Sequence, residues 1–151
     1  MQQKKILSGC SERIICEIPF KMPNLNDYIK VCRGNKFAAA SMKSGVENEI
    51  YYFIRSLPKI EYPVWIDFIW CEKDSRRDLD NIAFAKKFIL DALVKFGKLK
   101  DDGQAFVKGF SDRVEKSEDY KVILIIKEYK DERFKGSAVG KTARGNTASD
   151  D

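Results

Sequence analysis

The alternation of apolar and polar residues along the chain predicts four β-strands. Residues 13–20 (R-I-I-C-E-I-P-F) are rich in apolar and β-branched residues, as expected for a first strand. Between Val64 and Cys71 every second residue is large and apolar, which predicts a strand with one strongly buried face. A shorter strand is expected at residues 105–110. The run V-I-L-I-I within residues 121–128 is continuously apolar and indicates a strand in the centre of the sheet.

Two helices are predicted between these strands. Apolar residues recur at helical spacing within residues 37–57, and Pro58 ends that helix. Its apolar positions are Val46, Ile50, Phe53 and Ile54. A second helix is expected from about residue 80 to residue 96, with Gly97 as its C-terminal cap. Its candidate N-caps are Asp80 and Asn81. Residues 21–35 contain Pro23, three asparagines and Gly34 among basic residues and are interpreted as a loop.

These elements predict an α+β fold with the order β-α-β-α-β-β, in which a mixed sheet packs against two main helices. The 151 residues suit a single domain, which we place at residues 1–129. Residues 130–151 contain few apolar side chains and cannot offset the entropy lost on ordering. We therefore expect a disordered C-terminal tail.

The composition restricts the chemistry. The chain contains no histidine, which excludes Ser-His triads, histidine general bases and histidine-ligated metals. Any catalysis must use carboxylates, lysines, hydroxyls or a metal ion held by oxygen atoms. No two of the four cysteines form a C-x-x-C pair, so we expect reduced thiols rather than a zinc site or a disulfide framework.

Charge and hydropathy bear on partners and location. The net charge of +5 permits a nucleic-acid partner without requiring one. The mean hydropathy of −0.41 and the absence of a long apolar run predict no membrane span. No apolar stretch follows the polar residues 1–5, so no secretory signal is expected and we predict a cytoplasmic protein.

Acidic residues gather in three separated segments. These are R-R-D-L-D-N at residues 76–81, L-D-A-L at 90–93 and D-D-G-Q at 101–104. Asp78 and Asp80 lie at a strand-to-helix junction, where free N–H groups also favour a phosphate. Three carboxylates around a hard cation suit magnesium and phosphodiester hydrolysis. The alternative is purely structural: a helix cap at the first segment, a turn at the third, and two solvated arginines.

The order of these segments resembles the signature of the RusA family of Holliday junction resolvases. R-R-D-L-D-N is followed by L-D-A-L and by F-G-x-L-x-D-D-x-Q, and residues 23–28 resemble the family's N-terminal loop. The resemblance implies a homodimeric endonuclease that resolves four-way DNA junctions with Mg²⁺, or with Mn²⁺ in its place. It also implies that Asp78, Asp80 and Asp102 form the catalytic metal site. Asp101 is either a supporting carboxylate or part of the turn.

A lysine on the intervening helix supports catalysis in that family. Phe84 occupies the usual place of this lysine, and alignment from L-D-A-L assigns the role to Lys87 instead. In one continuous helix, residues 80, 87 and 91 would share a face, so Lys87 would pair with Asp91. Lys86 would then point away, toward solvent or a more distant phosphate.

The DNA-binding surface is predicted from basic and aromatic residues around this centre. The candidates are Arg76, Arg77, Lys87, Tyr28, Lys30, Arg33, Lys36 and Lys43. Each cation is alternatively an ordinary solvated charge, and Tyr28 alternatively packs the loop. Two other functions remain open: a catalytically idle DNA-binding protein of the same fold, and an α+β interaction domain that binds no nucleic acid.

Overall fold

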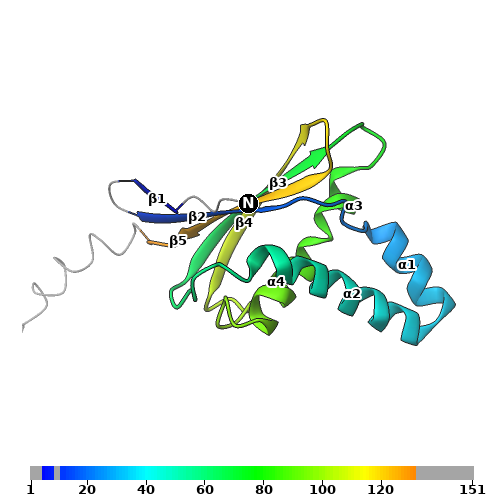
Figure 1. Cartoon of the computed structure of the whole chain (residues 1–151), viewed down its shortest axis with the longest axis horizontal. Coiled ribbons are helices and arrows are strands. Elements are labelled where there is room, and N and C mark those ends of the chain that lie inside the picture. Colours follow the sequence, from blue (N-terminus) through cyan, green and yellow to red (C-terminus); the bar gives the residue numbers. More distant parts are fainter. Residues whose placement is uncertain (1–4, 9–10, 132–151) are drawn as a thin grey trace, which may run out of the picture.

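In the part of the chain that the structure describes, five strands form a mixed sheet and four helices lie on one face of that sheet (Figure 1). The computed structural model describes residues 5–8 and 11–131. The strands are β1 (Lys5–Ser8), β2 (Ser11–Ile18), β3 (Val64–Glu72), β4 (Val107–Lys116) and β5 (Lys121–Glu128). The helices are α1 (Leu25–Gly34), α2 (Lys36–Ile54), α3 (Leu79–Ala83) and α4 (Lys86–Lys95).

The strand order β1-β2-β5-β3-β4 places β5 in the middle of the sheet, as its continuous apolar run predicts. β5 pairs antiparallel with both β2 and β3, while β4 runs parallel to β3 at the sheet edge. A parallel neighbour requires a crossover, and the chain between β3 and β4 supplies it as α3 and α4. The predicted α+β class and mixed sheet are therefore confirmed.

Alternate residues of the strands form the core beneath the helices. In β3, Val64, Ile66, Phe68 and Trp70 are at most 1% exposed, as the alternation predicts. Ile50 of α2 is likewise fully buried. This shared core holds α2 and α4 against one face of the sheet, and α2 and α4 also contact each other.

The opposite face of the sheet carries a polar cluster around Asp67. Its carboxylate accepts hydrogen bonds from Trp65 Nε1 (3.0 Å) and Ser111 Oγ (2.6 Å), and it pairs with Lys127. Burial by itself would raise the pKa of Asp67, but the hydrogen bonds from Lys127, Ser111 and Trp65 outweigh it, and the pKa is lowered. The cluster links β3, β4 and β5 across their hydrogen-bonded edges.

The predicted loop at residues 21–35 is wrong, because this segment contains α1. Asn24 is the N-cap: its side chain accepts from the backbone N–H of Asp27, and the Asp27 side chain accepts from the N–H of Asn24. This reciprocal capping box satisfies two donors at the helix start. Leu25, Tyr28, Ile29 and Cys32 recur at helical spacing in this segment, and the interpretation as a loop, based on its Pro and Asn residues, overlooked that signal.

Two further expectations need correction. The helix predicted at residues 80–96 is interrupted: α3 ends at Ala83, and a turn at Phe84 and Ala85 precedes α4. The strand predicted at residues 105–110 begins at Val107 and continues to Lys116, through residues that are mostly exposed. Strand β1 was not predicted. The observed order is therefore β-β-α-α-β-α-α-β-β.

The helix α2 and the strands β2, β3 and β5 otherwise follow the predicted positions closely. Gly97 adopts a positive φ of 73°, as expected of a glycine that ends a helix.

Cys16, Cys32 and Cys71 are free thiols, and burial raises the pKa of Cys16 to about 11. Within residues 5–8 and 11–131, every helix is too short or too polar to cross a lipid bilayer. The predicted tail lies outside the described residues, apart from Lys130 and Asp131.

Candidate active site

The segment that joins β3 to α3 is held by Arg77. Its guanidinium donates two hydrogen bonds to the Glu72 carboxylate (2.7 and 2.8 Å) and a third to the carbonyl of Met22 (2.8 Å). The Arg77 and Glu72 side chains are only 12% and 5% exposed. Arg76 is 88% exposed and lies 3.8 Å from Asp74. Of the two arginines predicted to contact DNA, Arg76 is therefore the accessible one, and Arg77 is engaged inside the protein.

Asp78 and Asp80 lie at the start of α3, and both side chains are exposed. Asp78 occupies the N-cap position but makes no side-chain capping bond. Asp80 lies in the first helical turn, so the predicted capping by Asp80 or Asn81 is wrong. Neither aspartate is engaged in capping α3, and both remain open to solvent.

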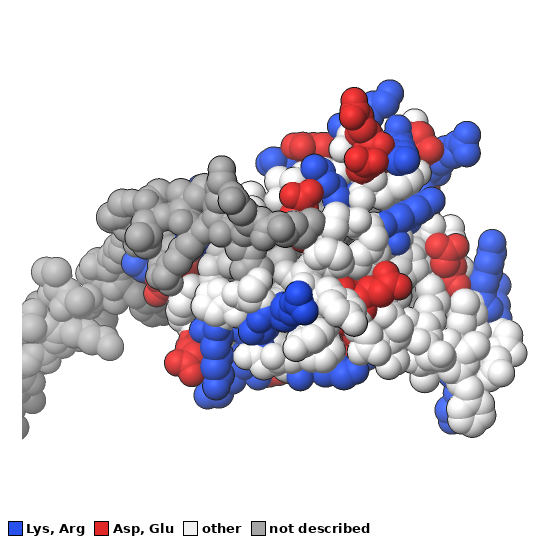
Figure 2. Space-filling model, viewed as in Figure 1, with Lys and Arg blue, Asp and Glu red and all other residues white. Residues whose placement is uncertain are grey.

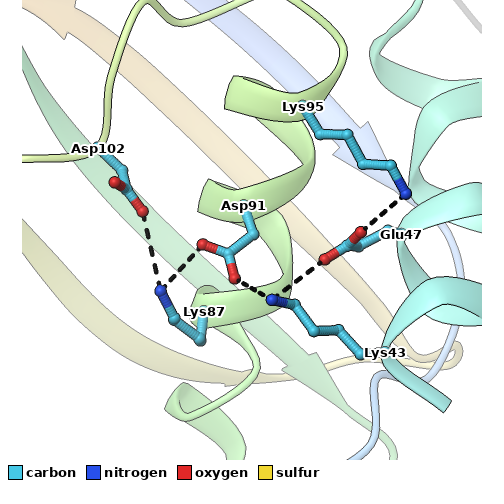
Figure 3. Close-up of polar contacts among 6 residues, drawn as sticks. All are labelled: Lys43, Glu47, Lys87, Asp91, Lys95 and Asp102. Atoms are coloured by element: carbon cyan, nitrogen blue, oxygen red, sulfur yellow. Dashed lines mark hydrogen bonds and ion pairs between the residues drawn. The ribbon is translucent and has the colours of Figure 1, made fainter. Parts of the chain in front are cut away.

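Lys87 brings two of the acidic segments together at α4 (Figure 3). Its ammonium donates to Asp91 Oδ1 at 2.9 Å and lies 3.9 Å from Asp102 Oδ2. The predicted pairing of Lys87 with Asp91 is confirmed. The premise of one continuous helix from residue 80 is wrong, because the turn at Phe84 and Ala85 separates α3 from α4.

A chain of alternating charges continues from Asp91 to α2 (Figure 3). Lys43 lies 2.9 Å from Asp91 Oδ2 and 3.7 Å from Glu47, and Lys95 lies 3.2 Å from Glu47. The close contact with Asp91 raises the pKa of Lys43. Burial alone would raise the pKa of Asp91, but the contacts with Lys43 and Lys87 lower it below its ordinary value. This chain of charges connects the helix layer to the turn that carries Asp102.

The expectation that Lys86 points away from the protein is wrong. Its ammonium pairs with Asp112 of β4 and lies 3.7 Å from the centroid of the Phe110 ring. The Lys86 side chain is only 16% exposed, whereas that of Lys87 is 60% exposed. Asp112 also accepts from Trp70 Nε1 at 2.9 Å. Lys86 therefore fastens α4 to the sheet, and Lys87 is the accessible lysine.

The acidic turn after α4 is shaped by Asp101. Its carboxylate accepts from the backbone N–H of Asp102 at 2.9 Å. Its other oxygen lies close to the Gly103 backbone, 2.9 Å from the place where a Cβ atom would stand. Asp101 thus serves the turn, and the Asp102 side chain is left to face Lys87.

A shallow hollow of about 430 Å³ between α1 and α2 contains three of the predicted DNA-binding residues. Its lining residues are Tyr28, Cys32, Lys36, Ala39, Ala40 and Lys43. We call it the basic groove.

Tyr28 also packs on Phe84 and Phe88, with ring centroids 5.3 and 5.9 Å from its own. A hydrogen bond with Cys32 raises the pKa of Tyr28. Tyr28 therefore has the packing role considered as the alternative, and it lies at the wall of the basic groove. Lys30 and Arg33 are exposed on α1 outside this lining.

The three predicted metal ligands fit a hard cation by chemistry, because all are carboxylates. Asp102 is 33% exposed, so all three can be reached from solvent. Within residues 5–8 and 11–131, no three acidic or cysteine side chains are close enough together to hold a metal ion. The donors are suitable, but in this arrangement they do not form a closed ligand set.

Charges of both signs are interspersed over the surface seen in Figure 2. They gather at the top of that view, over the loops at the end of β3 and between β4 and β5 in Figure 1. No uniformly basic face is visible from this side, so a DNA contact made through this face would depend on local groups rather than on a single large positive field.

No family model and no curated protein matches this chain. Among solved structures, it is similar to the periplasmic domain of MotB from Helicobacter pylori (residues 97–256). The identity is 15%, the alignment covers 97% of this chain and 100% of that one, and the TM-score is 0.40. A likeness at this level supports no conclusion about activity.

Proposed function

We propose that this protein is a magnesium-dependent endonuclease that binds four-way DNA junctions and resolves them by paired phosphodiester hydrolysis. The observation that carries the proposal is the contact of Lys87 with both Asp91 and Asp102. It joins two of the three motif segments of the RusA-like signature around a lysine that sequence alignment selected. The third segment, with Asp78 and Asp80, lies at the start of α3, the helix just before α4.

Asp78, Asp80 and Asp102 are the proposed metal ligands, with Mn²⁺ as the alternative ion. A bound metal ion would polarise the scissile phosphate and activate a water molecule. Because the three carboxylates do not form a closed set, we propose that the cation itself draws them together. The Lys87 ammonium, 60% exposed, would stand beside this centre and stabilise negative charge on the phosphate.

The basic groove and the exposed residues Arg33 and Arg76 form the proposed DNA surface. Lys36 and Lys43 line the groove. Arg33 is exposed near the C-terminal end of α1, and Arg76 is exposed just before the start of α3. Such cations neutralise backbone phosphates without reading sequence. The Lys43–Asp91 ion pair links the groove to Lys87.

The decisive test is a nicking assay on a four-way junction with magnesium. Asp80→Asn should abolish cleavage while junction binding stays intact or strengthens, because the change keeps the shape of the side chain and removes a negative charge. Asp78→Asn and Asp102→Asn should behave in the same way. Asp119→Asn, the same change at an exposed turn residue outside the motifs, is the matched control and should cleave normally.

The other outcomes identify the alternatives. Salt-sensitive junction binding without cleavage by the wild type would indicate an idle DNA-binding protein, since phosphate contacts weaken steeply with salt. Neither binding nor cleavage would indicate an interaction domain. Normal nicking by one of the three aspartate variants would remove that residue from the proposed site.

A further inference from the structure

Asp91 is held between two helices and binds two lysines at once (Figure 3). Its side chain is 16% exposed. One carboxylate oxygen accepts from Lys87, which is one turn earlier on α4, and the other lies 2.9 Å from Lys43 on α2. Removing a carboxylate from water is costly, and here two ammonium groups offset that cost. The position of Asp91 is therefore fixed from both sides.

The position of the Lys87 ammonium depends on its hydrogen bond to Asp91. Its side chain is 60% exposed, and a lysine stem in solvent populates many rotamers. Asp102, at 3.9 Å, is beyond hydrogen-bonding distance and does not hold the ammonium by itself. The hydrogen bond to Asp91 at 2.9 Å is the short contact, and it keeps Lys87 in front of Asp102.

We propose that Asp91 is a positioning residue of the candidate active site. It holds the Lys87 ammonium beside Asp102 with one oxygen, while the other oxygen anchors Lys43 at the wall of the basic groove. The inference rests on the proposed function, because Lys87 and Asp102 are the groups that Asp91 would serve.

Glu47 provides a matched control. Like Asp91 it is a nearly buried carboxylate that pairs with two lysines, and its contact with Lys95 also joins α2 to α4. It touches neither Lys87 nor Asp102 in this chain of charges. If Asp91 only fastened the two helices together, Asp91→Asn and Glu47→Gln would have the same consequences.

The first test does not depend on cleavage. Carbon-13 relaxation of the lysine Cε groups, measured on metal-free protein, reports how far each side chain is ordered. Lys87, assigned by loss of its signal in Lys87→Arg, should be more ordered than an exposed unpaired lysine. Asp91→Asn should remove that order, and Glu47→Gln should leave it. Unchanged order of Lys87 in Asp91→Asn would overturn the proposal.

The second test measures turnover on saturating junction DNA with magnesium. A misplaced catalytic group costs on the order of 10- to 100-fold, and we expect a loss of that size in kcat for Asp91→Asn, with a much smaller change in KM. In a Lys87→Ala background, Asp91→Asn should cause no further loss, because the effects of substituting residues that act through one another are not additive.

Full turnover in Asp91→Asn, additive losses in the double variant, or an equal loss in Glu47→Gln would each refute the positioning role of Asp91. A wild type that cleaves no junction would refute the proposed function, and the relaxation measurement would still decide the role of Asp91.

Discussion

The role assigned to Arg77 changes once its surroundings are known. In the sequence Arg76 and Arg77 are adjacent, lie beside a candidate phosphate site, and are equally good candidates for DNA contact. In the structure it forms a two-bond fork with Glu72, and its partner carboxylate is 5% exposed. The planar guanidinium suits this bidentate geometry, which a lysine cannot reproduce.

Arg77→Ala should therefore act on stability. The change leaves the Glu72 carboxylate buried without its partner, and breaking such a pair costs about 3–5 kcal/mol. Urea denaturation of the two alanine variants would measure this, with Arg76→Ala as the control. Arg76 is 88% exposed, so its removal should cost about 0–1 kcal/mol. Equal unfolding free energies for the two variants would contradict the assignment of Arg77 to the interior.

Lys86 and Lys87 are adjacent in sequence and have separate surroundings. Lys86 lies over the Phe110 ring and pairs with Asp112, while Lys87 lies in the chain of charges at the candidate site. An exposed lysine is the better candidate for contact with a phosphate, and a half-buried one for holding a helix on a sheet.

Lys86→Ala should accordingly lower stability by about 1–3 kcal/mol, because Asp112 loses a charged partner at a site that is 19% exposed. Lys87→Ala should lower stability less, because Asp91 keeps Lys43 as a charged partner, and should lower turnover on saturating DNA. Melting temperatures and single-turnover rates of the two variants separate these effects. The opposite pattern, with the stability loss at Lys87, would show that their roles are exchanged.

At the level of elements, β4 departs furthest from expectation. It is an edge strand whose ten residues are mostly exposed, so it lacks the alternating apolar signal by which strands are recognised. Pairing with β3 keeps it in place instead, with a register irregularity between Val64 and Trp65. At that point Gly109 faces the Trp65 ring, and a Cβ atom there would stand 2.3 Å from a ring carbon.

Gly109→Ala should destabilise the protein by about 1–3 kcal/mol, since the ring or the strand must shift to admit the methyl group. The matched control is Gly45→Ala in α2, where a Cβ atom meets nothing within 4 Å. Alanine is the better helix former by about 1 kcal/mol, so this variant should be slightly stabilised. Thermal unfolding of both variants provides the comparison, and a neutral Gly109→Ala would mean that β4 is not packed against Trp65 as described.

The whole molecule is a two-layer arrangement with helices on one face of the sheet (Figure 1). The candidate site lies in the crossover between the two parallel strands, where α3, α4 and the following turn are brought together. In the proposed function, one such centre would cut one DNA strand. Resolution of a junction requires two cuts on strands related by near two-fold symmetry.

A two-fold dimer is therefore expected at working concentrations, since an isologous pair supplies two matching sites. Sedimentation equilibrium with and without a four-way junction measures this, using Asp80→Asn to prevent cleavage. A strict monomer in both conditions would count against the resolvase proposal, while leaving a single-cut nuclease open.

The sequence by itself determined the α+β class, the central place of β5, the helix α2 and the absence of histidine chemistry, because each depends on local period or composition. It also identified the pairing of Lys87 with Asp91, which lies within one helical turn. Only the tertiary structure decided the partners of Lys86 and Lys43, which are contributed by other elements. Lys86 and Asp112 are 26 residues apart, and they meet because β4 takes its place beside β3. No periodicity in the sequence predicts such a contact, because the contact depends on how the elements pack together rather than on which residues form each element.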